Sequence, residues 1–330
     1  MRRLIGRYIP TIVKTAIAAG IFYFLLAKGV IELQPLAELL VHHNLAILSA
    51  ILLMGGLLVG ASRWWILLRS AEIPMSLLNV VRLYLIGAFF STWLPGAAGG
   101  DMARALYVVK GLESRRSTAV LTIALDRAFA LWGLLGIAAM LAMSNWQSRE
   151  LQPVLAYYIW LITGAILVCA VGGLAVYFIA RFVHIPVWPR WAAKARPIAH
   201  QLGRAIVLIV GHKGAMLSCA TLSIAASGLV ALGIVIISSA FEFGPAPLVA
   251  ALAGVIGNIS SAVPLTPGGL GVGEAVFAKI CLELGSNVGP YATIYLAFRI
   301  VMAVVGFCGA LFWLTKNFPA CPKTDLCKSD

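Results

Sequence analysis

The chain contains a succession of apolar stretches, each about 20 residues long, which is the length at which an α-helix crosses the hydrocarbon layer of a bilayer. We predict six full spans, at residues 11–30, 45–68, 118–143, 154–180, 215–239 and 290–315. Only 11% of the 330 residues are charged and 61% are hydrophobic, whereas about a quarter of a soluble domain is charged. The sequence therefore predicts a single integral membrane domain over residues 1–330, an all-α polytopic transmembrane bundle, and excludes a soluble fold.

Two further apolar segments, 78–94 and 247–263, each lead into a loop rich in glycine and proline. The loops read LPGAAGGD and PLTPGGLGVGE, and their backbone groups would lose their hydrogen-bond partners against lipid. We therefore predict two broken or re-entrant helical hairpins that border a protected cavity. The loop residues assigned to that cavity are Pro95, Gly96, Gly99, Gly100, Pro267, Gly268, Gly269 and Gly271.

The basic residues set the expected topology, because Lys and Arg concentrate in cytoplasmic loops. Suppose that the six long segments cross the membrane and that each hairpin returns to the side from which it entered. Nearly all Lys- and Arg-rich connecting segments then fall on one side of the membrane, and these include Arg104 and the basic joint 181–213. We expect an inner (plasma) membrane protein with both termini cytoplasmic. The net charge of +13 is explained by this topology and by contact with anionic lipid, so no nucleic-acid partner is predicted. The joint 181–213 is either a helix in the membrane interface or an ordinary connecting segment.

The two glycine-rich segments also align with each other at an offset of 172 residues. Pro95, Gly96, Gly99 and Arg127 match Pro267, Gly268, Gly271 and Arg299, while Asp101 and Glu274 are one position out of register. We take residues 78–143 and 247–315 as two repeat units of opposite orientation, an architecture typical of secondary transporters. The alternative is that the glycines serve only close helix packing.

Charged residues inside apolar spans are costly and are usually functional or paired. Arg127 and Arg299 occupy matching positions, and their guanidinium groups suit the planar recognition of phosphate. Arg82, within or near the end of its own apolar segment, is a further candidate for substrate binding. Asp126 either orients an arginine, carries a proton or ties helices together. Arg63, beside two tryptophans, is expected to anchor its helix at the membrane interface.

The acids that follow the glycine turns have two possible roles. Asp101 and Glu274 either cap the next half-helix or take part in proton coupling, and both are kept as candidate substrate-binding residues. No GxSxG, HExxH or P-loop pattern occurs in the sequence. We expect no catalytic residues, no metal site and no cofactor, and hence no enzyme.

Several motifs together resemble the lysylphosphatidylglycerol synthase transmembrane-region family, also called flippase-like proteins. They are RWWILLRSAEI, LPGAAGGDMARALYV, TAVLTIALDRAFAL and SAVPLTPGGLGVGEAVF, and the resemblance extends from about residue 10 to 316. In the full-length synthases a similar membrane region translocates an aminoacylated lipid that a separate soluble domain makes. Relatives are linked with hopanoid and polyprenyl-phosphate lipids. The resemblance implies the transport region without the aminoacyltransferase domain, and leaves the cargo open.

The expected function is that of a lipid translocase for an anionic or phosphate-bearing lipid, in which Arg127 and Arg299 hold the phosphate. Two alternatives stay open at this point. The chain is an accessory membrane subunit of a lipid-synthesis enzyme, or it is an intramembrane enzyme that modifies lipid with Asp126 or Glu274 as a general base.

Overall fold

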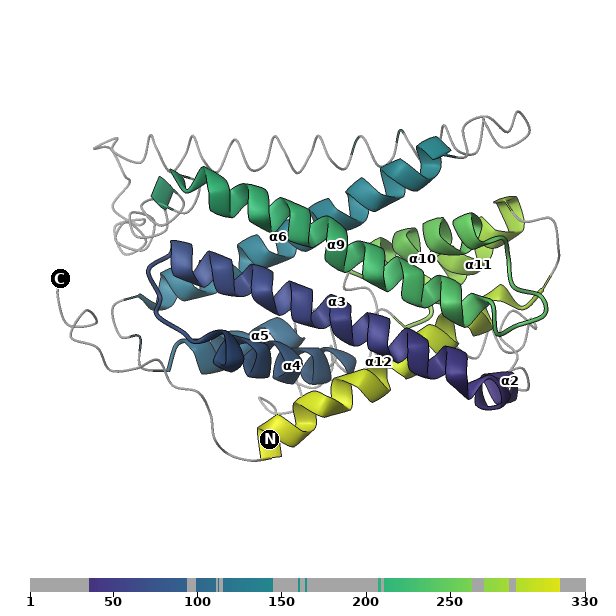
Figure 1. Ribbon diagram of the computed structural model, residues 1–330, viewed down its shortest axis with the longest axis horizontal. Coiled ribbons are helices and arrows are strands. Elements are labelled where there is room, and N and C mark those ends of the chain that lie inside the picture. The colour runs from purple at the N-terminus through teal and green to yellow at the C-terminus, as the bar shows by residue number, and fades with distance from the viewer. Residues whose placement is uncertain are drawn as a thin grey trace, which may run out of the picture.

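The computed structural model describes residues 36–93, 99–110, 112, 115–144, 207–208, 211–262, 270–284 and 289–314, together with residues 160 and 164. Within these residues the chain is helical and contains no strand, as predicted. The helices are α2 (Leu36–Val41), α3 (His43–Ser70), α4 (Leu77–Trp93), α5 (Gly99–Val108), α6 (Arg116–Ser144), α9 (Lys213–Ser238), α10 (Pro247–Ser261), α11 (Val272–Leu284) and α12 (Tyr291–Leu314) (Figure 1).

Four of these helices are long and apolar enough to cross a membrane. They are α3, α6, α9 and α12, with a mean hydropathy of 1.7 to 2.3 over their best windows. At most 44% of such a window is buried inside the protein, so much of the apolar surface faces outward, as expected for lipid contact. The predicted spans 45–68, 118–143, 215–239 and 290–315 are confirmed as such helices, whereas 11–30 and 154–180 lie outside the described residues.

Small residues allow the long helices to approach closely. A Cβ atom at Gly133 of α6 would lie 2.3 Å from the carbonyl oxygen of Ser223 in α9. A Cβ atom at Gly309 of α12 would lie 2.0 Å from the carbonyl oxygen of Leu85 in α4. Since van der Waals contact drives helix association in lipid, glycine at such crossings has a packing role.

The shorter helices form two hairpins, α4 with α5 and α10 with α11. The chain enters and leaves the first hairpin at one place, because Arg115, just before α6, lies 3.3 Å from Glu72, just before α4. The same holds for the second hairpin, where the ring of Phe243, before α10, lies 6.4 Å from that of Tyr291, the first residue of α12. The helices α4 and α10 begin and end within a few residues of the predicted segments 78–94 and 247–263.

The two hairpins lie toward opposite ends of the bundle (Figure 1). The first is at the end where α3 stops and α6 begins, and the second is at the end where α9 stops and α12 begins. From their hairpins, α6 and α12 run in opposite directions along the bundle. The second hairpin is the more deeply enclosed, since nine consecutive residues of α10, Val249 to Gly257, are all buried.

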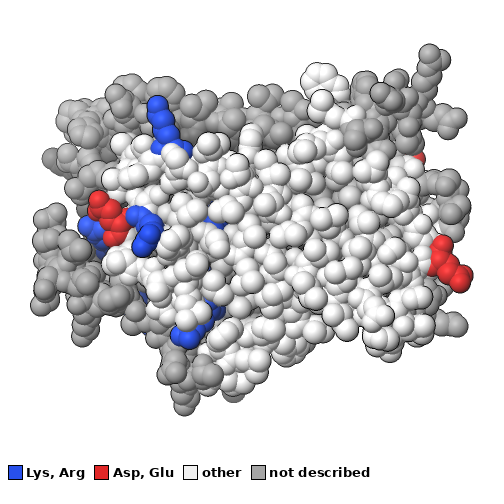
Figure 2. Space-filling view, viewed as in Figure 1, with Lys and Arg blue, Asp and Glu red and all other residues white. Residues whose placement is uncertain are grey.

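Basic side chains gather at the end of the bundle that holds the first hairpin (Figure 2). This end carries Arg69 in the last turn of α3, Arg116 at the start of α6 and Lys213 at the start of α9. The connection that ends at the second hairpin carries Glu242. Among the described residues the first end therefore carries the greater number of basic side chains, a bias of the kind expected across a membrane.

Candidate functional site

Five ionised side chains form a chain of alternating charge through the first unit. Arg63 Nε lies 2.8 Å from Asp126 Oδ1, and Asp126 Oδ2 lies 3.1 Å from Arg104 Nη1. Arg104 also donates through Nη2 to Asp101, whose second oxygen lies 2.5 Å from Arg127 Nε. The order Arg63, Asp126, Arg104, Asp101, Arg127 connects α3, α6 and α5 and returns to α6.

Helix geometry places these groups. Asp101 and Arg104 are three residues apart on α5 and so lie on the same face. Asp126 and Arg127 are consecutive on α6, and successive residues of a helix point about 100° apart. As a result Asp126 points into the bundle toward α3, while Arg127 reaches around α6 to the start of α5.

Neighbouring side chains support the buried part of this network. Arg63 donates from Nη1 to the hydroxyl of Ser223 in α9, at 3.1 Å. The guanidinium carbon of Arg104 lies 4.6 Å from the ring centre of Tyr84 and 5.2 Å from that of Trp64, a cation–π arrangement on two sides. Trp64 is itself fixed by a hydrogen bond of 3.1 Å to Thr122. Such additional contacts are what a buried ion cluster needs to offset its loss of hydration.

Burial falls steadily along the network. The exposed fractions of the side chains are 2% for Arg63, 1% for Asp126, 5% for Arg104, 20% for Asp101 and 45% for Arg127. Three cations and two anions leave one positive charge in excess. Because Arg127 is the most exposed member, that excess is accessible there.

A second acid–arginine pair occurs in the other unit. Arg299 Nε of α12 lies 2.9 Å from Glu274 Oε1 of α11; the contact is an ion pair and is not aligned as a hydrogen bond. The other oxygen of Glu274 accepts a hydrogen bond of 2.8 Å from the N–H of Gly271. Gly271 has a φ of 82°, which glycine adopts without strain, and this back-bonded acid is half of a capping box. Arg299 Nη2 donates to Ser261 Oγ, at 2.9 Å, at the end of α10.

The two pairs occupy equivalent places in their units. Asp101 follows Gly100 and Glu274 follows Gly273, and a Cβ atom at either glycine would collide with a serine hydroxyl of the preceding helix, Ser91 or Ser261. Eight residues separate Ser91 from Gly100 and eleven separate Ser261 from Gly273. The tip of the second hairpin is thus three residues longer, which explains why an ungapped comparison puts the two acids out of register.

The rest of the charged network has no counterpart in the second unit. Phe277 follows Glu274 by three residues, as Arg104 follows Asp101. Phe298 directly precedes Arg299, as Asp126 directly precedes Arg127. The positions of Arg104 and Asp126 are thus occupied by phenylalanine in the second unit. Both rings pack against Tyr295, with centroids 5.5 and 5.3 Å from it. An aromatic cluster therefore takes the place of Arg104 and Asp126 in the second unit. The excess positive charge of the network arises when Arg63 of α3, which precedes the first unit, is counted with the four members inside that unit.

One expectation about an individual arginine was wrong. Arg63 does not anchor its helix at the interface, because it is buried against Asp126 and Ser223. Arg104, which served in the sequence only as a guide to topology, belongs to the site, because Asp126 and Asp101 hold it inside the bundle. The spacing of Asp101 and Arg104 on one helix face was the signal in the sequence that could have placed Arg104 in the site.

The remaining predicted site residues are distributed as follows. Gly99 and Gly100 begin α5, while Pro95, Gly96, Pro267, Gly268 and Gly269 lie outside the described residues. Arg82 is not brought to the charged network, and its guanidinium carbon lies 6.0 Å from the ring centre of Phe312 in α12. Within the described residues no three His, Cys, Asp or Glu side chains are grouped to hold a metal ion.

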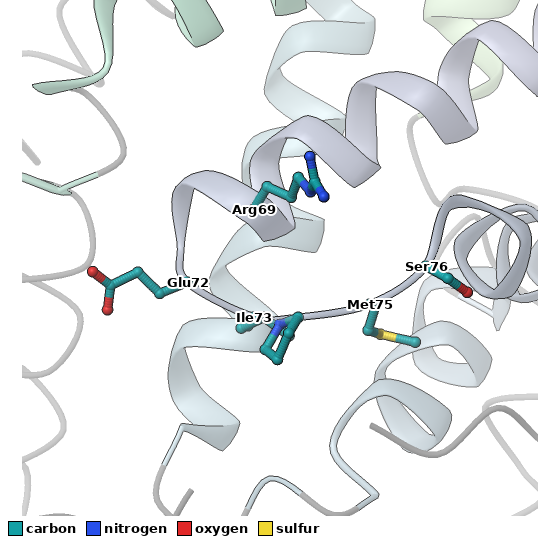
Figure 3. Close-up of a pocket in the computed structure, with 6 residues that line it drawn as sticks. Arg69, Glu72, Ile73, Met75 and Ser76 are labelled. Atoms are coloured by element: carbon teal, nitrogen blue, oxygen red, sulfur yellow. The ribbon is translucent and has the colours of Figure 1, made fainter. Parts of the chain in front are cut away.

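A hollow at the turn between α3 and α4 is separate from this network (Figure 3). Its lining runs from Arg69 through Glu72 to Ser76, and its charged side chains have partners nearby. The guanidinium carbon of Arg69 lies 4.4 Å from the ring centre of Trp65, and Glu72 is paired with Arg115. The hollow marks the point where the first hairpin joins the bundle.

The family model described as the lysylphosphatidylglycerol synthase TM region matches residues 11–310. The chain belongs to the lysylphosphatidylglycerol synthase transmembrane-region family. The matched range contains both hairpins and both acid–arginine pairs, so the geometry described above lies inside the family's membrane region. A search of curated proteins found no match, and a search of solved structures found none either. As a member of this family, the protein is a multi-pass membrane protein associated with lipid synthesis or translocation.

Proposed function

We propose that this member of the lysylphosphatidylglycerol synthase transmembrane-region family is a lipid translocase that moves an anionic or phosphate-bearing lipid across the inner membrane. The observation that carries the proposal is the charged network of the first unit. It holds one positive charge in excess within an apolar bundle and ends on the half-exposed Arg127. An uncompensated cation is costly in such surroundings, and a phosphate group would neutralise it through the guanidinium fork.

The arrangement of the helices supports movement across the membrane. The two hairpins lie toward opposite ends of the bundle (Figure 1), and each places an acid at the start of its second helix beside an arginine of the following helix. We propose that the two units are an inverted repeat whose hairpins re-enter the membrane from opposite sides, as in transporters that alternate the access to a central site. The lipid tail would stay in the bilayer while the headgroup passes through the bundle.

The charge asymmetry supports an orientation. The end that carries Arg69, Arg116 and Lys213 would face the cytoplasm, which places both termini there in the predicted arrangement of spans. Membrane lipids are the proposed partners. The family description names a synthase of a phosphate-bearing lipid, which agrees with such a cargo, and the proposed role is transport without covalent change to the lipid.

The test is transport by the purified full-length chain in proteoliposomes. Fluorescent phosphatidylglycerol and phosphatidylcholine are placed in the inner leaflet, and their arrival outside is followed by quenching with a membrane-impermeant reductant. Faster movement of phosphatidylglycerol than in protein-free vesicles, and faster than that of phosphatidylcholine, is the expected result. Lipid that is chemically altered would indicate an enzyme. No movement by the chain alone, with activity restored by a co-purified synthesis enzyme, would indicate an accessory subunit.

A further inference from the structure

The two acid–arginine pairs are equivalent in position but differ in how firmly each is held. In the second unit the side chain of Glu274 is completely buried and that of Arg299 is 18% exposed. In the first unit Asp101 is 20% exposed and Arg127 is 45% exposed. The first pair therefore reaches the surface of the protein, whereas the second is largely enclosed by it.

The bonds of Glu274 explain why its pair is fixed. One carboxylate oxygen faces Arg299 and the other accepts from the backbone of Gly271, while Arg299 also donates to Ser261. These contacts join α10, α11 and α12 around one buried charge. Removing the arginine would leave a carboxylate in an apolar interior with backbone donors and no counter-ion among the described residues, which is strongly unfavourable.

Asp101 differs because it has two arginine partners. One oxygen accepts from Arg104, which Asp126 holds from its other side, and the second oxygen faces Arg127. If Arg127 turned away, Asp101 would keep its bond to the buried Arg104. The pair of Asp101 and Arg127 can therefore separate at its exposed side without leaving a carboxylate unpaired.

We propose that Asp101 is an internal counter-ion that a ligand phosphate displaces from Arg127, and that the pair of Glu274 and Arg299 is a fixed counterpart that does not exchange. The inference rests on the proposed function and names the residue that contacts the cargo. Arg127 binds the oxyanion, and Asp101 is a positioning residue that competes with it. The network from Arg63 to Arg104 keeps Asp101 in place when the ligand is bound.

The experiment is native mass spectrometry of the full chain released from nanodiscs that contain phosphatidylglycerol and phosphatidylcholine in equal amounts. Wild type is compared with Asp101→Asn, Arg127→Gln, Glu274→Gln and Arg299→Gln. Lys279→Gln is the control, since Lys279 is 71% exposed on α11 and its loss changes the charge without touching either pair. The melting temperature of each variant is measured alongside, so that binding is read only from folded protein.

The expected result is that Asp101→Asn retains phosphatidylglycerol about fivefold more tightly, because a competing internal anion is removed, and that Arg127→Gln loses the preference by about tenfold. Glu274→Gln would lower the melting temperature without raising the affinity. If Asp101→Asn does not fold, Asp101→Ser, which is smaller and also uncharged, gives the same comparison. Unchanged or weaker binding in a folded Asp101 variant would overturn the inference.

The remaining outcomes separate the inference from the function. A preference for phosphatidylglycerol that depends on Arg299 and not on Arg127 would overturn the inference and leave the proposed function standing. No preference in wild type, together with no Arg127-dependent binding of inorganic phosphate, would overturn both. A second arm adds inorganic phosphate. Binding of inorganic phosphate that depends on Arg127, without any preference for phosphatidylglycerol, would keep the exchange and overturn the lipid as its ligand.

Discussion

Asp126 of α6 and Arg63 of α3 form an ion pair of 2.8 Å in which both side chains are at most 2% exposed. The second oxygen of Asp126 is bonded to Arg104 of α5, so one carboxylate compensates two buried cations. Three helices that are distant in sequence are joined at this residue. The pair is therefore both the anchor of the charged network and the place where the bundle is most sensitive to the loss of a single charge.

Replacing Asp126 with alanine is expected to destabilise the protein by about 3–5 kcal/mol, because it leaves Arg63 buried without a counter-ion and takes from Arg104 one of its two. The measurement is thermal unfolding in detergent, monitored as the loss of the monodisperse peak in size-exclusion chromatography. Thr122→Ala on the same helix removes two neutral hydrogen bonds, one from Trp64 and one to the carbonyl of Ala119, and serves as the comparison. An Asp126→Ala variant that melts with wild type would refute the proposed anchoring role.

The aromatic cluster of the second unit suggests how to separate the contribution of the charged network to protein stability from its contribution to lipid binding. The triple variant Arg63→Met, Arg104→Phe, Asp126→Phe removes two cations and one anion and copies the aromatic packing of Phe277 and Phe298. We expect it to fold with a stability within about 2 kcal/mol of wild type, since well-packed apolar residues often replace a buried ion cluster without loss. Its preference for an anionic lipid should nevertheless disappear, because the excess positive charge is gone. A folded triple variant that still selects phosphatidylglycerol would contradict the role given to the network.

The contact between α6 and α9 depends on one glycine. Gly133→Ala is expected to destabilise the protein by about 1–3 kcal/mol, because its Cβ would lie 2.3 Å from the Ser223 carbonyl oxygen and force the helices apart. Gly136→Ala, on the same helix, is the matched control, since the nearest atom is a side-chain carbon at 3.9 Å. The melting temperatures of the two variants check the prediction. Equal losses in both would show that the close approach is not the cause.

The proposed orientation can be tested with single cysteines in a background without native cysteines. Arg116→Cys lies at the basic end of the bundle, and Glu242→Cys lies in the connection to the second hairpin. In intact cells a membrane-impermeant maleimide is expected to label Glu242→Cys, and to label Arg116→Cys only after the membrane is opened. The reverse labelling pattern would place the basic end outside.

The sequence predicted the long helices and the two hairpins because their signals are local. Apolar length defines a span, and closely spaced glycine and proline residues, as in LPGAAGGD and PLTPGGLGVGE, interrupt a helix. Arg104 was not predicted as a site residue, because the basic residues were used as a guide to topology. A buried arginine near the end of a helix cannot be told by its sequence position from one in a cytoplasmic loop. Its place depends on Asp126, 22 residues away, and such a partner is visible only once the helices are packed.

The correspondence of Asp101 with Glu274 was out of register for a different reason. Ser91 and Ser261 are 170 residues apart, Asp101 and Glu274 are 173 apart, and Arg127 and Arg299 are 172 apart. The longer tip of the second hairpin separates the first two offsets, and an ungapped comparison at 172 follows the arginines instead of the acids. The contacts of Gly100 with Ser91 and of Gly273 with Ser261 fix the register independently. The unequal burial of Arg127 and Arg299 could not be predicted from the sequence either, because it depends on how deeply each hairpin is enclosed.

The most direct test of the account is the rate at which labelled phosphatidylglycerol crosses proteoliposome membranes that contain wild type, Arg127→Gln, Arg127→Lys or Lys279→Gln. The account predicts that Lys279→Gln transports like wild type and that Arg127→Gln slows transport by about tenfold or more, because the charge and the guanidinium fork are both lost. Transport retained in Arg127→Lys would assign the effect to charge alone, and its loss would assign it to the fork. Transport at the wild-type rate in both Arg127 variants, confirmed as folded, would contradict the central claim.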